Sequence, residues 1–482
     1  LPALLDAAMA RTYSANPGAN FFTAGGLHRF ANFNRDHDHR TIALSEAFRH
    51  SVNLPFIRLM RDIVEHTIAD AVPDFRELLT EPRHPARREY LARFADREGT
   101  EFLDGFFRTH RGRAPDETLA LLAGRVRRPT QERLAVVFRS VRPEAAPEEL
   151  AEFLRGRLPE AKVDPAAAGR LHDRYGPDRF SLADRGYLAG IHPLELWLVG
   201  YLQTAPDSTR ALMLQASEAE RQAAYAWLFK TRHKKAQDTR IRILLEEDAF
   251  VRIGAAWRRL GYPFDRLVPS YATAIGSSGD RPAALAELIG IVLDDGVRRP
   301  SVRIERLHFA AGTPYETVVG REAGPGERVL PAEVAATVRK VLADVVENGT
   351  AKRVAGAFVG PDGSRLAVGG KTGTGDNRHQ RYAADGRVIE SRVINRTATF
   401  AFFIGDRFFG VITAHVAGPE AAKYDFTSSL PAQILKVLAP AFQPLIDRVE
   451  PRLAAPDAGD DDDGRTVLVE RVSAHEGSVA VD

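Results

Sequence analysis

The pentapeptide KTGTG at residues 371–375 decides the fold, and it follows a short run, 365–369, that has the pattern of a strand. Its lysine supplies a fixed positive charge for an anionic ligand, and its threonine hydroxyls can hydrogen-bond a carboxylate. Its glycines let an extended peptide lie close to the strand edge and pair with the main chain. The N–H of Thr374 is available to an oxyanion. A K-T-G triplet alone is a weak signal, because such triplets occur by chance and a Lys-Thr-Gly turn is a common loop. A peptide-binding strand edge is the sharper prediction.

Two further runs, Thr397–Ile404 and Phe409–Val416, flank the short turn 405–408 and predict a hairpin next to this strand. Both runs are apolar on nearly every position, as central strands covered by helices on each side would be. Phe400, Phe402 and Phe403 are therefore expected in the sheet core. Helices are predicted from Pro282 to about Leu293 and from Pro331 to the stop signal at 348–349.

A second motif, Ser51-Val52-Asn53, lies in a helical pattern from Thr41 to Val64. Pro55 should end or kink that helix just after Asn53, because proline lacks an N–H and clashes with the preceding turn. Ser51 and Asn53 are then expected at an exposed helix end. Taken alone, such residues often only cap helices.

Four segments in a fixed order resemble the transpeptidase domain of class A penicillin-binding proteins. They are residues 43–55 around the S-x-N motif, 271–282, 346–351, and the K-T-G motif at 371–375. The resemblance covers about 1–75 and 246–440. It implies an α+β fold of the penicillin-binding-protein and serine β-lactamase type, with a central antiparallel sheet and helices on both faces.

The resemblance also implies residue roles. Ser51 would belong to a proton relay toward the leaving amine, and Lys371 would lie near Ser51 and tune its proton affinity. Asn53 would hydrogen-bond the acyl side of the donor peptide. The residues implied in holding the substrate carboxylate and the adjoining backbone are Thr372, Gly373 and Thr374.

The motif that carries the acylated serine in this family, S-x-x-K, is absent from all 482 residues. Because the chain begins with Leu1 and no motif precedes Ser51, we expect the nucleophile upstream of Leu1; loss of the serine is the alternative. The implied reaction is two-step acyl transfer from D-Ala-D-Ala to a neighbouring stem peptide, inhibited by β-lactams. The implied setting is the periplasmic face of the inner membrane, reached through an N-terminal anchor outside this sequence, with cell-wall machinery proteins as further partners.

Residues 76–245 have no counterpart in the resemblance and predict an all-helical insert between the two transpeptidase parts at 1–75 and 246–440. The densest basic run of the chain lies there, between Lys230 and Arg242. A solvated helix face is the simple explanation; contact with an anionic cell-wall polymer, lipid head groups or a partner is the alternative. Residues 441–482 are acidic and predict a disordered tail.

Composition excludes several classes of site. The chain has no cysteine, so disulfides, thiol nucleophiles, thiolate zinc sites and iron–sulfur clusters are ruled out. Its net charge of +2 gives no strong field toward nucleic acid, and we expect neither nucleic-acid binding nor a cofactor. The sequence His37-Asp38-His39 lies among charged residues and predicts a solvated loop rather than a metal site.

Two other functions remain open. A β-lactamase or carboxypeptidase of the same fold is disfavoured, because the flanking segments resemble the synthases and no hydrolytic glutamate motif stands out. A scaffold protein that keeps the penicillin-type pocket without its serine, and binds cell-wall partners through the helical insert, is the second alternative.

Overall fold

The computed structural model describes residues 1–448 except 24–25, 263–266, 279–280, 303, 305, 321–323 and 383–387. Contacts divide the chain into two compact units. The sheet unit comprises Leu1–Thr67 and Ala249–Asp482, and the helical unit comprises Ile68–Asp248. The sequence predicted these boundaries between residues 75 and 76 and between residues 245 and 246. The units are described separately below.

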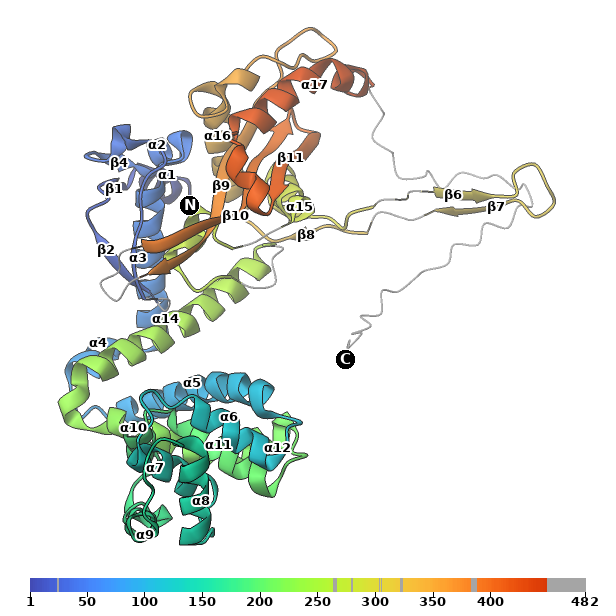
Figure 1. The fold of residues 1–482 in the computed structure, drawn as a ribbon. Coiled ribbons are helices and arrows are strands. Elements are labelled where there is room, and N and C mark those ends of the chain that lie inside the picture. The colour runs from blue at the N-terminus through green and yellow to red at the C-terminus, as the bar shows by residue number, and fades with distance from the viewer. Residues whose placement is uncertain are drawn as a thin grey trace. The chain divides into compact units, whose positions relative to one another are not determined.

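The main sheet has three antiparallel strands in the order β11-β10-β9 (Figure 1). They are β9 (Val368–Tyr382), β10 (Val388–Ile404) and β11 (Phe408–Ala417). The predicted hairpin is confirmed as β10 and β11. The strand expected before KTGTG is misplaced, because β9 begins only at Val368 and contains the motif itself. Among the described strands, β9 is an edge, as binding of an extended peptide requires.

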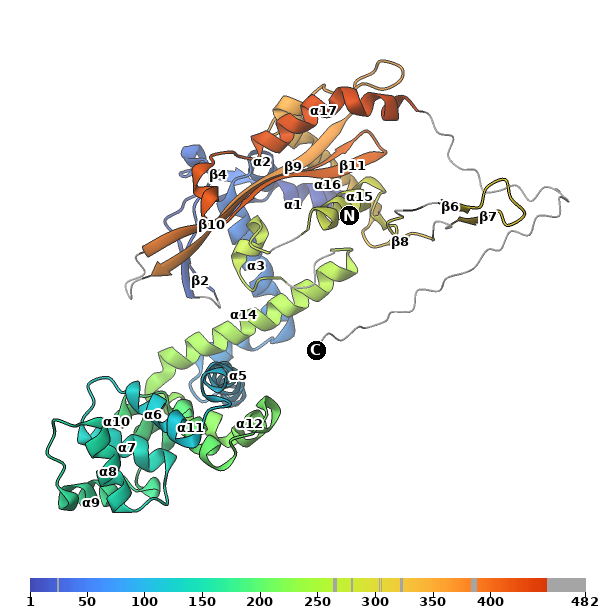
Figure 2. The ribbon, with the colours of Figure 1, turned by 45° about the vertical axis from the view of Figure 1, so that its right-hand side comes forward.

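The side chains of β10 alternate between two apolar layers. Phe400, Phe402 and Ile404 pack in a cluster with α17 (Ser429–Asp447). Ala401 and Phe403 pack in another with α15 (Pro282–Leu293) and α16 (Ala332–Glu347). Figure 2 shows α17 and the pair α15 and α16 on opposite sides of the sheet. The expectation that these phenylalanines form sheet core is confirmed.

The N-terminal segment supplies the S-x-N motif. Helix α1 (Pro2–Ala10) precedes β1 (Thr12–Ser14), which pairs with β4 (Thr41–Ala43) directly before helix α2 (Leu44–His50). Helix α3 then runs from Asn53 to Ala71. The predicted break was placed too late. The first helix ends at His50, and Pro55 lies in the first turn of the next helix, where its missing N–H is no loss.

The remaining strands of the sheet unit form small two-stranded pairs. These are β2 (Asn20–Thr23) with β3 (Gly26–Arg29), β5 (Val297–Arg298) with β8 (Glu327–Arg328), and β6 (Arg306–Phe309) with β7 (Thr317–Gly320). Short helical turns are η1 (Arg35–His37), η5 (Tyr271–Ile275), η6 (Lys352–Val354) and η7 (Pro419–Lys423). The disordered tail predicted from 441 begins too early, because α17 extends to Asp447. The acidic residues after 448 lie outside the described residues.

The helical unit contains no strand in residues 68–248. Its helices are α4 (Phe75–Thr80), α5 (Ala86–His110), α6 (Pro115–Gly124), α7 (Gln131–Val141), α8 (Pro147–Arg157), α9 (Pro165–Arg174), η2 (Pro177–Arg179), α10 (Leu182–Ala189), α11 (Pro193–Thr204), α12 (Arg210–Ala216), α13 (Glu218–Ala224), η3 (Ala226–Phe229), η4 (Thr231–His233) and the first part of α14 (Lys234–Arg259). Residues 182–201 have the apolar spacing of a single helix, but in the structure they are broken into two, α10 and α11.

That break has a local cause. Gly190 adopts a left-handed conformation with φ of 69°, which ends α10, and Pro193 opens α11. The longest helix confined to this unit, α5, was not predicted from the sequence. Its apolar residues, among them Leu91, Phe94 and Leu103, alternate with many charged residues on the solvent-exposed face, so the apolar pattern is weak in the sequence. In the described part of the chain, no helix is long and apolar enough to cross a membrane.

Candidate active site

The turn between α2 and α3 presents Ser51. This residue has φ 54° and ψ 43°, a left-handed conformation that only few non-glycine residues adopt. Its N–H donates to the carbonyl of Phe48 at 3.3 Å, and the N–H of Val52 donates to that of Ala47 at 2.9 Å. Both bonds satisfy carbonyls that the end of α2 leaves open. The strained turn therefore fixes the backbone from which the Ser51 hydroxyl projects.

Lys371 on β9 meets this hydroxyl, although the two residues are 320 positions apart in sequence. Its Nζ donates to Ser51 Oγ and, at 3.0 Å, to the carbonyl of Thr372. The ammonium also lies 5.6 Å from the centre of the Phe48 ring, within range of a cation–π contact. No carboxylate forms an ion pair with Lys371 among the described residues.

Burial lowers the pKa of Lys371 to about 8, because the charged ammonium is removed from water without a compensating anion. The lysine is thus still largely protonated near neutral pH, yet it releases its proton far more easily than a solvated lysine. Such a group can stabilise an anionic ligand in its charged form and accept a proton in its neutral form. Its hydrogen bond brings the Lys371 ammonium directly to Ser51 Oγ.

Thr372 is buried, and its hydroxyl is shared between two others. Thr372 Oγ1 lies 3.4 Å from Ser51 Oγ and 2.6 Å from Thr350 Oγ1. Any of these hydroxyls can be the donor, because hydroxyl protons rotate to suit their partners. Lys371, Ser51, Thr372 and Thr350 therefore form one continuous chain of hydrogen-bonding groups, which we call the hydroxyl chain.

Thr350 was not predicted as a site residue. It lies in the segment 346–351 that carried part of the family resemblance, but its distance from Ser51 and Lys371 in sequence gave no reason to place its hydroxyl there. The signal that could have identified Thr350 is its position directly after the Asn348-Gly349 stop that ends α16. Because α16 packs against both α2 and β9, a residue just past its end is brought to the junction of the two motifs.

An ion pair and a close backbone contact hold this junction together. Arg49 Nε donates to Asp344 Oδ2 at 2.5 Å, and the N–H of Thr350 donates to the Arg49 carbonyl at 3.3 Å. A Cβ on Gly349 would lie 2.3 Å from that carbonyl oxygen, so only glycine fits. Burial works to raise the pKa of Asp344, but hydrogen bonds from Asn348 and Arg49 outweigh it and hold the pKa below its usual range.

His37 of the predicted solvated loop stacks on His50, with ring centres 5.6 Å apart. Burial, reinforced by the neighbouring His37, lowers the pKa of His50. Among the described residues, no group of three or more histidine, aspartate or glutamate side chains could hold a metal ion.

The other predicted site residues are not joined to the hydroxyl chain. Asn53 Nδ2 donates to the carbonyl of Ala31 at 3.0 Å. Thr374 Oγ1 accepts a hydrogen bond from the N–H of Ser428 at 2.9 Å, which ties β9 to the start of α17. Gly373 is exposed, and a Cβ there would meet nothing within 4 Å. The roles proposed for Asn53, Gly373 and Thr374 toward a substrate remain predictions.

Several solved structures are similar to part of this chain. The D,D-transpeptidase domain of a peptidoglycan glycosyltransferase from Eggerthella lenta is 17% identical, with 41% of this chain and 50% of that one covered and a TM-score of 0.27. Penicillin-binding protein 3 from Mycobacterium tuberculosis, complexed with ampicillin, is 17% identical. The match covers 42% of this chain and 48% of that one, with a TM-score of 0.26. A peptidoglycan synthetase from Bifidobacterium adolescentis is 14% identical. The match covers 43% of this chain and 38% of that one, with a TM-score of 0.25.

No family model and no curated protein matches the chain. The alignments with the three solved structures span half of their length or less.

Proposed function

We propose that this chain is part of a penicillin-binding D,D-transpeptidase that cross-links peptidoglycan stem peptides in its complete form. The observation that carries the proposal is the contact of Lys371 with Ser51. The lysine, whose pKa is lowered, lies on the edge strand β9 and donates a hydrogen bond to the hydroxyl of Ser51, which stands 320 positions away in sequence on a turn of left-handed backbone. That arrangement suits transfer of a proton at a site that also attracts a carboxylate.

In this proposal the donor stem peptide adds to β9 as an extended strand, with its terminal carboxylate near Lys371. A serine hydroxyl attacks the carbonyl of D-Ala-D-Ala, the C–N bond breaks, and D-alanine leaves with a proton delivered through Ser51. An amine of a second stem peptide then attacks the acyl-serine ester and releases the serine. β-Lactams would acylate the same serine.

The proposal needs a nucleophile that no S-x-x-K motif in these 482 residues supplies. The form expected to react is one that carries such a motif before Leu1. Further elements of the proposal are a class A synthase context, a membrane anchor outside this sequence, and a site of action in the periplasm. D-Ala-D-Ala stem peptides and β-lactams are its proposed ligands.

A scaffold function is favoured by one specific observation, the missing S-x-x-K together with a helical unit as large as Ile68–Asp248. In that case the hydroxyl chain would be a remnant, and partner binding through the helical unit would be the function.

A fluorescent penicillin separates the two functions. It is applied to this chain and to a form extended upstream to the natural start, each with its Lys371→Ala variant. Covalent labelling of the extended form alone, lost on Lys371→Ala, is the expected result. Absence of labelling in a folded extended form would overturn the transpeptidase proposal and favour the scaffold.

A further inference from the structure

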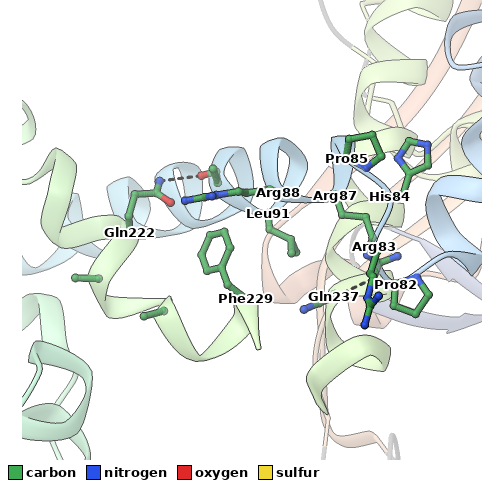
Figure 3. A pocket seen from close by; sticks show the side chains of 13 residues that line it. Pro82, Arg83, His84, Pro85, Arg87, Arg88, Leu91, Gln222, Phe229 and Gln237 are labelled. Atoms are coloured by element: carbon green, nitrogen blue, oxygen red, sulfur yellow. Dashed lines mark hydrogen bonds between the residues drawn. The ribbon is translucent and has the colours of Figure 1, made fainter. Parts of the chain in front are cut away.

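The helical unit contains a groove with a volume of about 850 Å³, which lies in the size range of ligand pockets. It lies between the first half of α5 and the segment formed by α13 and η3, with α14 contributing one residue (Figure 3). All of its lining residues belong to this unit; they are Pro82, Arg83, His84, Pro85, Arg87, Arg88, Leu91, Ala92, Gln222, Ala223, Ala226, Phe229 and Gln237.

The middle of the groove is apolar. Leu91 projects from α5 and Phe229 projects from η3 in Figure 3. Three alanines, Ala92, Ala223 and Ala226, also line the groove. Leu91 is 3% exposed, so it serves the core as well as the groove, whereas Phe229 is only half-buried. An apolar side chain placed between them would remove the exposed part of Phe229 from water, which is favourable.

The margin of the groove is cationic. Arg83 and Arg88 are exposed, and the side chain of neither forms an ion pair or a hydrogen bond to another described residue. No aspartate or glutamate lines the groove; Glu89, the neighbour of Arg88 along α5, is not among the lining residues. Exposed Lys230 directly follows Phe229 and adds a further positive charge nearby. The groove therefore offers two guanidinium groups whose hydrogen-bonding capacity is unused.

The walls of the groove are held in place without a ligand. Buried Arg87 donates to the Leu78 carbonyl at 2.7 Å, to Gln237 Oε1 at 3.0 Å and to Asp238 Oδ1 at 2.7 Å. Across the groove, Gln222 Nε2 donates to the carbonyl of Ala92 at 3.0 Å, a bond drawn in Figure 3. Arg87 is neutralised by Asp238, so the charge available to a ligand is that of Arg83 and Arg88. A preformed site binds with little loss of conformational freedom.

We propose that this groove binds an acidic peptide segment of a partner protein, with an apolar side chain between Leu91 and Phe229 and carboxylates on Arg83 and Arg88. Guanidinium groups pair with carboxylates through two parallel hydrogen bonds, which gives both strength and orientation. The concave shape selects a peptide over a lipid surface, because a flat bilayer would reach the two arginines but not Leu91. This site goes beyond the transpeptidase proposal and does not depend on it.

The test uses the whole chain and fluorescein-labelled peptides read by fluorescence anisotropy. The probe is EELEFEE, which combines carboxylates with two apolar side chains. Two control peptides remove one feature each: QQLQFQQ has no charge, and EESESEE has no apolar side chain. We expect binding of EELEFEE that is weaker by about tenfold or more for both controls, since each loses one half of the recognition.

Variants then locate the site. Arg83→Glu with Arg88→Glu is expected to weaken binding of EELEFEE by about a hundredfold, because two attractive charges become repulsive. Arg232→Glu with Lys235→Glu changes the same net charge on exposed residues outside this groove, and should leave binding within about threefold of the original through long-range charge alone. Phe229→Ala tests the apolar centre without altering charge. Thermal unfolding followed by circular dichroism checks that each variant is folded.

Three results would overturn the proposal. Equal losses in the groove pair and the control pair would mean that binding is unspecific attraction. Binding of vesicles of phosphatidylglycerol, but of none of the peptides, would mean that the groove margin faces a lipid surface. Self-association that is abolished by the groove pair in sedimentation experiments, without peptide binding, would make a second copy of the chain the occupant.

Discussion

The hydroxyl chain of the sheet unit and the groove of the helical unit are built in opposite ways. At the hydroxyl chain, Lys371, Ser51, Thr372 and Thr350 already bind one another, and the lysine is withdrawn from water. At the groove, the guanidinium groups of Arg83 and Arg88 stand in water with no partner among the described residues. The first arrangement lowers the pKa of Lys371, as proton transfer near neutral pH requires, whereas the second leaves strong donors free for an external acceptor.

The largest effect is expected from Lys371→Ala in the upstream-extended form. Removal of the ammonium takes away both the proton partner of Ser51 and the charge for the ligand carboxylate. Acylation by a fluorescent penicillin should fall by about a thousandfold or more, of the size typical for loss of a general acid–base group. The Arg83→Glu and Arg88→Glu pair is the matched control from the other unit and should label normally. Normal labelling of folded Lys371→Ala would remove this lysine from the site.

The next effect concerns the independence of the two cores. Phe400→Ala in the sheet and Leu134→Ala in α7 each delete a side chain that is 0–1% exposed, and each should lower the free energy of unfolding of its own unit by about 2–5 kcal/mol. Differential scanning calorimetry of the whole chain should show two transitions, each variant lowering one of them. A single transition lowered equally by both variants would show that the units unfold together.

Much of the sheet unit could be predicted from sequence, because its strongest signals are local. The apolar runs of β10 and β11 and the short turn between them specify a hairpin without reference to the rest of the chain. Pro282 and Pro331 likewise marked the starts of α15 and α16 within a residue, and Asn348-Gly349 marked the end of α16. The helical unit was harder, since α5 carries so many charged residues that its apolar face is hard to detect.

Only the residues of the candidate site that lie in the family motifs could be predicted from the sequence. Ser51 and Lys371 were proposed as neighbours from the resemblance, but nothing local to either one determines that β9 passes the end of α2. Thr350 and the Arg49–Asp344 ion pair arise from the packing of α16 against both, which is a property of the tertiary fold. The groove in the helical unit was likewise out of reach, because its two sides are more than a hundred residues apart in sequence.

A smaller effect is expected from pH. The pKa of Lys371 is about 8 in the folded protein and near its ordinary value of 10.5 when unfolded, so the unfolded chain binds more protons between these values. The free energy of unfolding should therefore rise with pH from about 8 to 10.5, by at most about 3 kcal/mol from this group. Lys371→Met should remove that rise and be the more stable form below pH 8. Denaturant titrations of both proteins across this range provide the measurement, and Lys230→Met, at an exposed lysine, is the control. Parallel pH profiles for the chain and Lys371→Met would contradict the assignment.

The smallest effect is expected at Thr350, the member of the hydroxyl chain most distant from Lys371. Thr350→Val keeps the shape of the side chain but leaves Thr372 Oγ1 without its 2.6 Å partner in a buried position. A lost hydrogen bond of this kind amounts to about 1–2 kcal/mol, so the acylation rate of the extended form should fall by about tenfold. Thr350→Ser restores the hydroxyl and should restore the rate, which a role in packing alone would not predict.

Were both variants equally slow, the methyl group and not the hydroxyl would matter. Since Thr350 contacts Ser51 only through Thr372, its effect should also vanish in a Thr372→Val background, and that non-additivity would show that the four groups act as one chain rather than as separate contacts.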